Sequence, residues 1–337
     1  MKRFVLIDGH SLLFRAYHAL PKTFTDETGH PVNAIYGFMS MVIRVANDLK
    51  PDYLVVAFDE KGPTFRHQEL VTYKQGRPEM DTELQEQQPI VREMLKSFSI
   101  PFFSVEGYEG EDVIATVINK VKSAKGQVVK RAGSVNSQMS IVDSQLEVFI
   151  VSGDRDVLQL VSQGVKVYSP RKGLSDPVIY DESNVAEVFG VPAGQITDFK
   201  GLRGDCSDRI PGVFGIGEKT AVQLIKEFGT VEDIYRHIAE VRARFGESVE
   251  KKLIEGAEQA VLSKRLATIV GDAPVTIDLS LCIFHDLGTR VAGLEFLSRL
   301  RFKSLIKRLT GSEEIVSERK KKPRKTDKVS AGQSPLL

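Results

Sequence analysis

The sequence predicts an α/β protein whose parallel or mixed sheet is flanked by helices and followed by a helical C-terminal region. Three observations lead to this prediction. Continuous apolar runs, typical of parallel strands buried on both faces, alternate with amphipathic stretches in the first 180 residues. Beyond that point the strand-like runs stop while helical patterns continue. Hydrophobic residues make up 42% of the 337 and charged residues 27%, which is typical of a soluble globular protein with a sizeable core.

The predicted strands and helices can be placed in order along the chain. Strands are expected at 4–8, 53–59, 101–107 and 147–154, of which 101–107 is the weakest apolar run. Amphipathic helical patterns occupy 11–20, 36–49, 82–98 and 111–124. We therefore expect an α/β body at 1–180, a helical region at 181–310 and a basic, disordered tail or linker at 311–337.

Charge and cysteine content narrow the class of protein. The net charge of +1 conceals eleven Lys and Arg against four Asp and Glu in residues 301–337, so the first 300 residues are acidic. An acidic body with a basic tail favours either metal-binding carboxylates or no specific function, and the positions of the acids must decide. Two cysteines are too few for a disulfide framework, and the sequence shows neither a signal peptide nor a membrane span. We therefore expect a cytoplasmic protein.

Nine acidic residues follow predicted strands or lie in turns. Three apolar runs end in an aspartate, the fourth is followed by GYEGED, and GDCSD lies further on. The nine are Asp8, Asp59, Glu109, Glu111, Asp112, Asp154, Asp156, Asp205 and Asp208. The carboxyl ends of parallel strands meet at one edge of a sheet, and so many carboxylates stay ionised together only beside cations.

Oxygen ligands without histidine indicate Mg²⁺ or Mn²⁺ rather than zinc, and two such ions are the usual device for displacement at phosphate. A single aspartate after a strand is more often a helix cap or turn residue, but four strand ends share the feature here. Glu109 and Asp112 share a helix face if a helix begins there, whereas Glu111 points elsewhere and is the less secure ligand.

The stretch GDCSDRIPGVFGIGEKTA allows two interpretations of its glycines. A phosphate-binding P-loop requires Lys directly after the last glycine and a preceding strand, but here Glu218 intervenes and the upstream segment is helical. What remains is a helix, a hairpin containing Gly212, Gly215 and Gly217, and a second helix. Amides at the start of the second helix then bind a backbone phosphate without reading bases, and Lys219 adds charge. A simple turn between two helices stays open as the alternative.

Six motifs, taken in this order, resemble the 5′-nuclease (flap endonuclease-like) family: DGHSLLFRAYHAL, FRH with YKQGR, GYEGEDV, SGDRDVLQL, GDCSDRIPG and GVFGIGEKTAVQLI. The resemblance runs from about residue 3 to residue 309 and is strongest to the N-terminal 5′–3′ exonuclease domain of bacterial DNA polymerase I. It implies a PIN-like α/β body, a helical arch over the active site at about 62–95 and a helix-hairpin-helix on duplex DNA. It also places the family's metal ligands on the nine acids named above.

The resemblance implies further site residues, carried over motif by motif. In the arch, the catalytic residues Arg66, Lys74 and Arg77 are expected to contact the scissile phosphate, and Tyr73 to stack on single-stranded DNA. The other expected DNA contacts are Arg15, Tyr17, Gly212, Gly215, Gly217, Lys219 and Thr220. Arg15 and Tyr17 are two residues apart and cannot share a helix face, so at least one of them is free to pack. A solvated basic face is the alternative for the arch residues.

Three features depart from the family's pattern. Glu111 replaces a shorter aspartate, so the charge is kept but the metal geometry can shift. Arg209 replaces an asparagine, and this cation beside the site either alters the affinity for the second metal or points at phosphate. Residues 128–146 lengthen a connection that is usually short. Because this segment precedes its strand, we expect a surface loop at the edge of the sheet away from the acids.

Together these features predict a structure-specific 5′–3′ exonuclease and 5′-flap endonuclease that hydrolyses DNA by a two-metal mechanism in replication and repair, including removal of Okazaki primers. Expected cofactors are two or more Mg²⁺ or Mn²⁺ ions, with K⁺ at the helix-hairpin-helix. Expected partners are 5′-flap, nicked or branched DNA and a polymerase domain or protein, with no membrane partner; we expect a nucleoid-associated monomer. The alternatives are a non-catalytic DNA-binding module and a PIN-type ribonuclease, which would lack the helix-hairpin-helix and keep only about four acids.

Overall fold

The computed structural model describes residues 1–123, 128–130, 138–140, 146–170 and 177–312. Most of the predicted tail at 311–337 lies outside these residues, as does most of the 128–146 segment. Within the described part of the chain, no helix is both long and apolar enough to cross a membrane.

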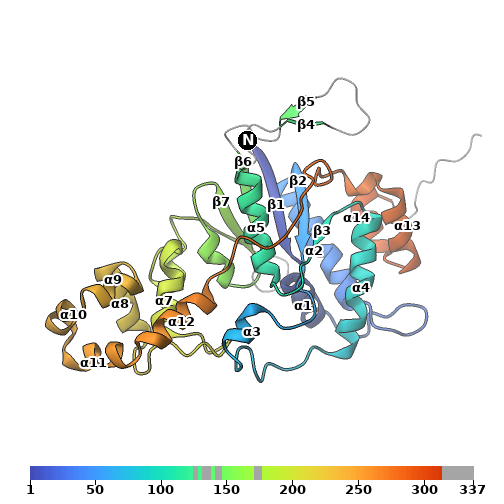
Figure 1. Cartoon of the computed structure of the whole chain (residues 1–337). Helices are drawn as coiled ribbons and strands as arrows, with labels where there is room; N and C mark the ends of the chain where they lie inside the picture. The colour runs from blue at the N-terminus through green and yellow to red at the C-terminus, as the bar shows by residue number, and fades with distance from the viewer. Residues whose placement is uncertain (124–127, 131–137, 141–145, 171–176, 313–337) are drawn as a thin grey trace, which may run out of the picture.

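A six-stranded sheet forms the centre of the body (Figure 1). Its strands lie in the order β3 (Phe102–Phe103), β2 (Tyr53–Ala57), β1 (Lys2–Asp8), β6 (Leu146–Val151), β7 (Val165–Ser169) and β8 (Val178–Tyr180). Neighbours are parallel except β7 and β8, so the sheet is mixed. The predicted third strand shrinks to two residues, and β7 and β8 were not predicted. Both of the missed strands are short and near the edge, where the apolar signal is weakest.

Alternation along β1 explains why both faces of the sheet are covered. Phe4 and Leu6 point into one hydrophobic core, and Val5 and Ile7 point into the other. On the first side lie α5 (Gly110–Ser123) and the helical region. On the second side lie α1 (Gly9–Ala19), α2 (Asn33–Leu49), α4 (Thr82–Ser97), α13 (Val291–Arg299) and α14 (Lys303–Thr310). With helices on both faces, continuous apolar strands are the expected pattern.

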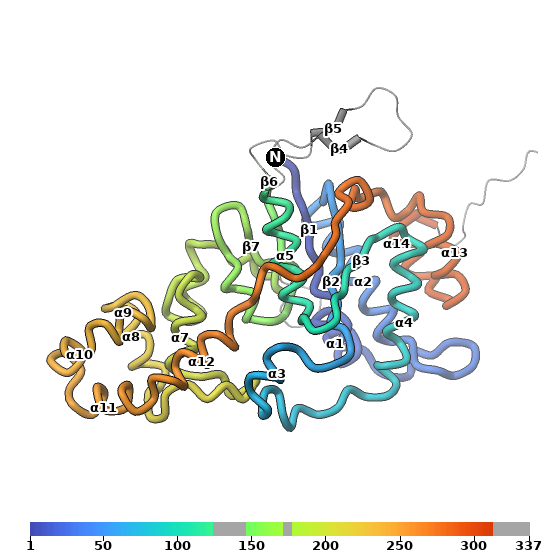
Figure 2. The backbone as a smooth tube through the Cα atoms, viewed as in Figure 1, coloured from blue at the N-terminus to red at the C-terminus, as the bar shows by residue number. Residues whose placement is uncertain are grey.

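The helical region projects from one side of the body (Figure 2). It contains α6 (Ala186–Phe189), α7 (Ile196–Arg203), α8 (Glu218–Phe228), α9 (Val231–Arg236), α10 (Ile238–Phe245), α11 (Glu247–Glu255) and α12 (Ala257–Ala267). The chain then returns to the body, where Leu54 N–H donates to the Cys282 carbonyl at 2.9 Å and α13 packs on α4. The helices that project from the body therefore end with α12, at about residue 267, and the rest of the predicted 181–310 unit packs on the body.

The predicted helical arch at 62–95 is only partly helical. It consists of a short helix, α3 (Phe65–Glu69), then residues 70–81 without helix or strand, then α4. Since α4 packs against α2 and α13 in the body, only residues 62–81 of the predicted arch are available to cover the acids. We call the region where the nine predicted acids lie the acidic edge.

The segment predicted as a loop contains a small antiparallel pair, β4 (Val128–Lys130) with β5 (Gln138–Ser140). The position expected for this segment, at the edge of the sheet away from the acids, concerns residues that lie mostly outside the described part of the chain.

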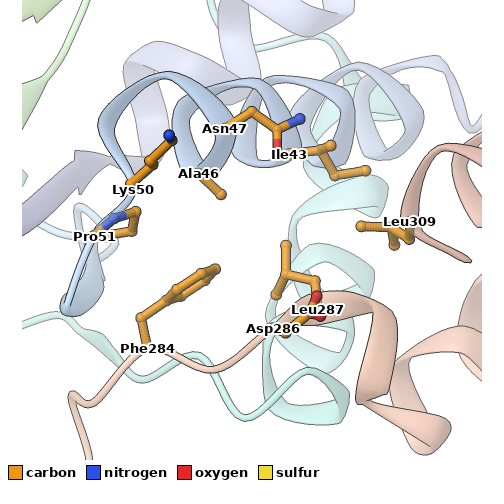
Figure 3. Close-up of a pocket in the computed structure, with 9 residues that line it drawn as sticks. All are labelled: Ile43, Ala46, Asn47, Lys50, Pro51, Phe284, Asp286, Leu287 and Leu309. Carbon is orange, nitrogen blue, oxygen red and sulfur yellow. The ribbon is translucent and has the colours of Figure 1, made fainter.

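A pocket of about 330 Å³ lies between the C-terminal half of α2 and the segment that precedes and includes α14 (Figure 3). Its lining residues are Ile43, Ala46, Asn47, Lys50, Pro51, Phe284, Asp286, Leu287 and Leu309. None of the nine predicted ligands lines it, so the candidate site must be sought elsewhere.

Candidate functional site

Asp8 is fixed at the end of the central strand by hydrogen bonds to its neighbours. It caps α1 by accepting from Ser11 N–H at 3.0 Å, and Ser152 Oγ donates to its other oxygen at 2.6 Å. Burial raises the pKa of Asp8 to about 7, and the nearby charges of Asp59 and Asp154 add to the rise. The carboxyl is therefore placed where a bound cation would stabilise its charged form.

Asp59 and Asp154 complete a group that we call the strand-end acids, Asp8, Asp59 and Asp154. Gly110 N–H donates to Asp59 Oδ1, and a Cβ at Gly110 would lie 3.0 Å from that oxygen, so the glycine of EGED leaves room for the carboxylate. His10 Nδ1 lies 3.5 Å from Asp59 Oδ2.

Asp112 and Arg66 form a buried pair, which corrects two expectations. Arg66 Nη1 and Nη2 donate to Asp112 at 2.8 and 2.9 Å, while Glu109 N–H and Val270 N–H donate to the same carboxylate at 3.0 and 2.9 Å. Four donors leave Asp112 no free lone pair for a metal. Arg66 is fully buried and donates onward to the Leu266 and Thr268 carbonyls, so it positions Asp112 and α12 rather than reaching a scissile phosphate.

Tyr73 and Lys74 connect the loop after α3 to the acids. The Tyr73 hydroxyl lies 3.3 Å from Glu109 Oε2 and 3.1 Å from Asp208 Oδ2, and Lys74 Nζ donates to Glu109 Oε1 at 2.7 Å. The ring of Tyr73 is buried against Ile210 and Leu266, so the expected stacking on a base is not available to it here. Lys74 remains 24% exposed beside the carboxylates.

Arg77 lies closest to solvent among the predicted arch cations, since its side chain is 49% exposed. It pairs with Asp208 Oδ1 and approaches the Ser207 carbonyl at 3.3 Å. Arg209, which follows Asp208, has a left-handed backbone with φ of +57°, and its guanidinium lies directly against Gly76 of the same loop. The loop at 70–81 and the turn at 205–210 are thus held together around Asp208.

Lys200 on α7 bridges two predicted ligands and was missed from the sequence. Its ammonium donates to Asp205 Oδ2 at 2.6 Å and to Asp156 Oδ1, and the residue is only 2% exposed. A signal was present, because Lys200 follows Ile196 by four residues and therefore lies on the apolar face of α7. A lysine at such a position needs buried acidic partners.

The electrostatics differ across the acidic edge. Burial, with the charges of Glu109 and Asp156, raises the pKa of Glu111 well above its ordinary value. Burial also raises the pKa of Asp156 to about 6 in spite of Lys200. For Asp205, burial is outweighed by Lys200 and Ser207, and its pKa is lowered. Burial therefore disfavours the charged forms of Asp8, Glu111 and Asp156, even though Arg66 and Lys200 lie close to the last two.

A divalent ion fits this donor set in charge and chemistry. The side chains offer carboxylate oxygens, which Mg²⁺ and Mn²⁺ prefer. In the described parts of the chain, no group of three or more Asp, Glu, His or Cys is already arranged around one point as a finished metal site. Resident cations hold several of the carboxylates instead, so metal binding requires side chains to turn.

The two residues expected from α1 differ. Tyr17 is buried, and its hydroxyl donates to Asp81 at 2.6 Å and to Glu83 at 3.0 Å, so it anchors the start of α4 rather than meeting substrate. Arg15 is half-buried, and its guanidinium lies close to Gly153, the residue before Asp154. Its position is consistent with the expected substrate contact.

The glycine-rich hairpin joins α7 to α8 as predicted. Gly212 has φ of +63°, and a Cβ there would lie 2.2 Å from Gly204 N, so only glycine fits. Gly215 has φ of +79°, and its carbonyl accepts from Lys252 Nζ at 3.2 Å. Gly217 is the N-cap of α8 and supplies no side chain to cap the helix.

The outer face of this hairpin is open. Lys219 is exposed, Thr220 is half-buried and the ring of Phe214 at the tip is 96% exposed. The first amides of α8 are therefore accessible from the side on which Lys219 lies, as the helix-hairpin-helix interpretation requires.

Comparisons with known proteins agree with this architecture. The family model for the 5′–3′ exonuclease N-terminal resolvase-like domain matches residues 3–131, and that for the 5′–3′ exonuclease C-terminal SAM fold matches residues 191–288. DNA polymerase I of Caldicellulosiruptor bescii is 40% identical over 322 residues, which is 94% of this chain and 34% of that protein. DNA polymerase I of Bacillus subtilis is 40% identical over 299 residues, or 85% of this chain and 31% of that protein. The chain thus spans about a third of the length of these curated relatives.

Two kinds of solved structure share the fold. T5 5′-exonuclease with bound divalent metal ions (zinc) superposes with a TM-score of 0.60 at 20% identity, covering 93% of this chain and 100% of that one. The catalytic core of Rad2 in complex with DNA substrate gives 0.51 at 17% identity, covering 93% and 90%. At these identities the likeness establishes the fold, a mixed sheet of the PIN-like resolvase type with a helical SAM-like region. Taken together, the two family models and the shared fold show that the chain belongs to the 5′–3′ exonuclease family.

Proposed function

We propose that this chain is a divalent-metal-dependent 5′ nuclease that hydrolyses DNA phosphodiesters at 5′ flaps and 5′ ends. One observation carries the proposal. Asp8, Asp59 and Asp154 lie beside Glu111 and Asp156, and burial raises the pKa values of Asp8, Glu111 and Asp156. Carboxyl groups whose charged forms burial disfavours in this way are stabilised by a bound cation.

We propose the cation-binding residues from among the nine acids named above. The strand-end acids and Glu111 would hold one divalent ion or its waters, and Glu109, Asp156, Asp205 and Asp208 would hold a second. Asp112 is left out because its oxygens are already occupied. Divalent ions, when bound, lower the pKa of the attacking water and offset the charge on the departing oxygen. Mg²⁺ or Mn²⁺ is the proposed cofactor, with K⁺ at the hairpin.

The chain's own residues bind and orient the DNA. Lys74 and Arg77 are the exposed cations nearest the acids, so they are placed to receive the scissile phosphate. To bind the phosphate, Lys74 must give up its ion pair with Glu109, and Arg77 must give up its ion pair with Asp208. Arg15 lies near the strand-end acids and is placed to neutralise the same strand.

The hairpin holds the duplex on one side of the cut. Open amides at the start of α8 and the charge of Lys219 suit a backbone phosphate, and such contacts fix register without reading sequence. Asp205 and Asp208 lie within the short turn at 205–210, which directly precedes the hairpin. Duplex binding and metal binding are therefore rigidly linked.

The relatives named above suggest the setting. We propose a role in replication and repair of the kind that removes Okazaki primers, in the cytoplasm at the nucleoid, alongside a polymerase domain or protein. The proposed substrate is 5′-flap, nicked or branched DNA, bound by a monomer.

A cleavage assay tests the proposal. A 5′-flap DNA, a flap-free duplex and a structured RNA, each labelled, are incubated with Mg²⁺ and separately with EDTA. We expect the flap to be cut with Mg²⁺ only, and the double variant Asp154→Ala, Asp156→Ala to be inactive. An uncut flap would favour a non-catalytic DNA-binding module, and cleavage of RNA alone would favour a PIN-type ribonuclease.

A further inference from the structure

We propose that Lys200 is a resident cation of the acidic edge that weakens binding of a divalent ion at Asp156 and Asp205. The first ion would then bind at the strand-end acids, and the second only at higher metal concentration. This inference rests on the proposed function, because it concerns the same acids, but it makes a claim about metal affinity that cleavage alone does not test.

The placement of Lys200 is imposed by the fold. It lies on the buried face of α7 between Phe199 and Leu202, and its stem has no route to solvent. A buried ammonium is costly unless paired. Lys200 pairs with Asp156, at the start of the 3₁₀ turn Asp156–Leu160, and with Asp205 in the turn after α7. The ammonium therefore stays charged and close to both acids.

The oxygens that Lys200 occupies are those a metal would need. Asp205 Oδ2 accepts from Lys200, while Asp205 Oδ1 accepts from Ser207 N–H at 2.9 Å and Ser207 Oγ at 2.6 Å. Asp156 Oδ1 accepts from Lys200 as well. A divalent ion that binds this pair must displace a donor, and it would lie within a few Å of a fixed positive charge, where repulsion is strong.

The strand-end acids show the opposite arrangement. Asp8 accepts from Ser11 N–H and Ser152 Oγ, which are neutral donors, and Asp59 accepts from Gly110 N–H. A divalent ion that binds here does not have to displace an ammonium such as that of Lys200 from these acids, so we expect this end to fill first.

A second lysine provides the matched control. Lys264 on α12 also bridges two acids, with its Nζ at 2.6 Å from both Asp198 Oδ1 and Glu232 Oε2, and it is 23% exposed. Asp198 belongs to α7, as Lys200 does. Removing Lys264 therefore disturbs the same helix and the same kind of bridge, but no predicted metal ligand.

The test is Mn²⁺ binding to the full chain without DNA, followed by electron paramagnetic resonance of the free ion. Lys200→Met is compared with Lys264→Met and the unchanged protein. We expect Lys200→Met to tighten the weaker class of Mn²⁺ site about tenfold or more, while the tighter class stays within about twofold. Lys264→Met should change neither class. A folded Lys200→Met protein whose weaker class is unchanged or weaker would overturn the inference.

A second measurement covers the case in which Lys200→Met does not fold. In the unchanged protein labelled with ¹⁵N-lysine, the buried Lys200 ammonium is protected from solvent exchange and is followed by NMR during a Mg²⁺ titration. We expect its signal to move with the second equivalent of Mg²⁺ and not with the first. Movement with the first equivalent, or none at saturation, would contradict the proposal.

These outcomes separate the inference from the proposed function. Two unequal classes of metal site without flap cleavage would leave the inference standing and remove the nuclease proposal. Flap cleavage with two equal classes of site would remove the inference alone. A protein that binds no Mn²⁺ would overturn both.

Discussion

The two ends of the acidic edge are built from the same residue types but neutralised differently. At one end, Asp8 accepts from the neutral donors Ser11 N–H and Ser152 Oγ, and its pKa rises to about 7. At the other end, Asp112, Glu109, Asp208 and Asp205 each pair with Arg66, Lys74, Arg77 or Lys200, and the pKa of Asp205 falls. One end depends on a bound ion for its charge balance, while the other largely supplies its own cations.

The largest expected effect on activity comes from the strand-end acids. Asp154→Asn keeps the shape of the side chain but removes a charge from one of the strand-end acids. We expect flap cleavage to fall by more than about 100-fold. Mutation of a residue that only supports a metal ligand already lowers metal affinity or activity by about 10–100-fold. Single-turnover cleavage at saturating Mg²⁺ measures this loss. Asp198→Asn, a buried acid paired with Lys264 away from the edge, serves as the control and should retain cleavage.

The largest expected effect on stability comes from the end of the edge where Arg and Lys side chains pair with the acids. Arg66→Met leaves Asp112 charged and buried without its partner, which costs about 3–5 kcal/mol of unfolding free energy. Urea unfolding measures it. The double variant Arg66→Met, Asp112→Leu should recover much of the loss, because it removes the stranded charge as well. If the double variant is as unstable as the single one, the pair is not the source of the effect.

Arg77 tests whether the cost of losing an ion pair depends on burial, because its side chain is half-exposed whereas that of Arg66 is buried. Arg77→Met should cost no more than about 1 kcal/mol of unfolding free energy, since exposed pairs contribute little. It should nevertheless slow flap cleavage by at least about tenfold, because it removes a cation proposed to contact the phosphate. Loss of stability without loss of cleavage would make Arg77 a structural residue.

The pH dependence of stability provides a test without substrate. In EDTA, between pH 3.8 and about 7, folded Asp8 holds a proton that the unfolded chain has lost, so the free energy of unfolding decreases as pH rises through this window. We expect thermal unfolding at a higher temperature at pH 5 than at pH 8. In Asp8→Asn, which retains an acceptor for Ser11 N–H, this difference should shrink. An undiminished slope would place its origin elsewhere.

A smaller effect is expected at the hairpin, which lies outside both ends. Gly215→Glu strains a residue with φ of +79° and adds a negative charge where a phosphate would bind. Affinity for a duplex, measured by fluorescence anisotropy, should fall about tenfold, while Mn²⁺ binding stays unchanged. Unchanged duplex affinity would show that the hairpin serves only to connect α7 and α8.

The sequence was sufficient for the fold class and for the position of the strand-end acids. Apolar runs that end in aspartate are local features, and the parallel sheet brings their ends together. The hairpin was also predictable, because its glycines are adjacent in sequence.

The sequence could not show which acids are already neutralised. Arg66 is 46 residues from Asp112, and Lys74 is 35 residues from Glu109, so both pairings arise only from tertiary packing. For the same reason Tyr17 and Tyr73, expected to meet DNA, are buried instead, because their hydroxyls reach Asp81 and Asp208 across the fold. Of these cations, only Lys200 could have been recognised from the sequence, because it is a lysine on the apolar face of a helix.

The most direct test of the contrast between the two ends is to see where the first divalent ion binds. A crystal of the full chain soaked with a limiting amount of Mn²⁺ gives anomalous peaks that mark the ion. We predict that the strongest peak lies among Asp8, Asp59 and Asp154, and that a peak at Asp156 and Asp205 appears only at higher Mn²⁺. A first peak beside Lys200, or equal peaks at both ends, would contradict this account.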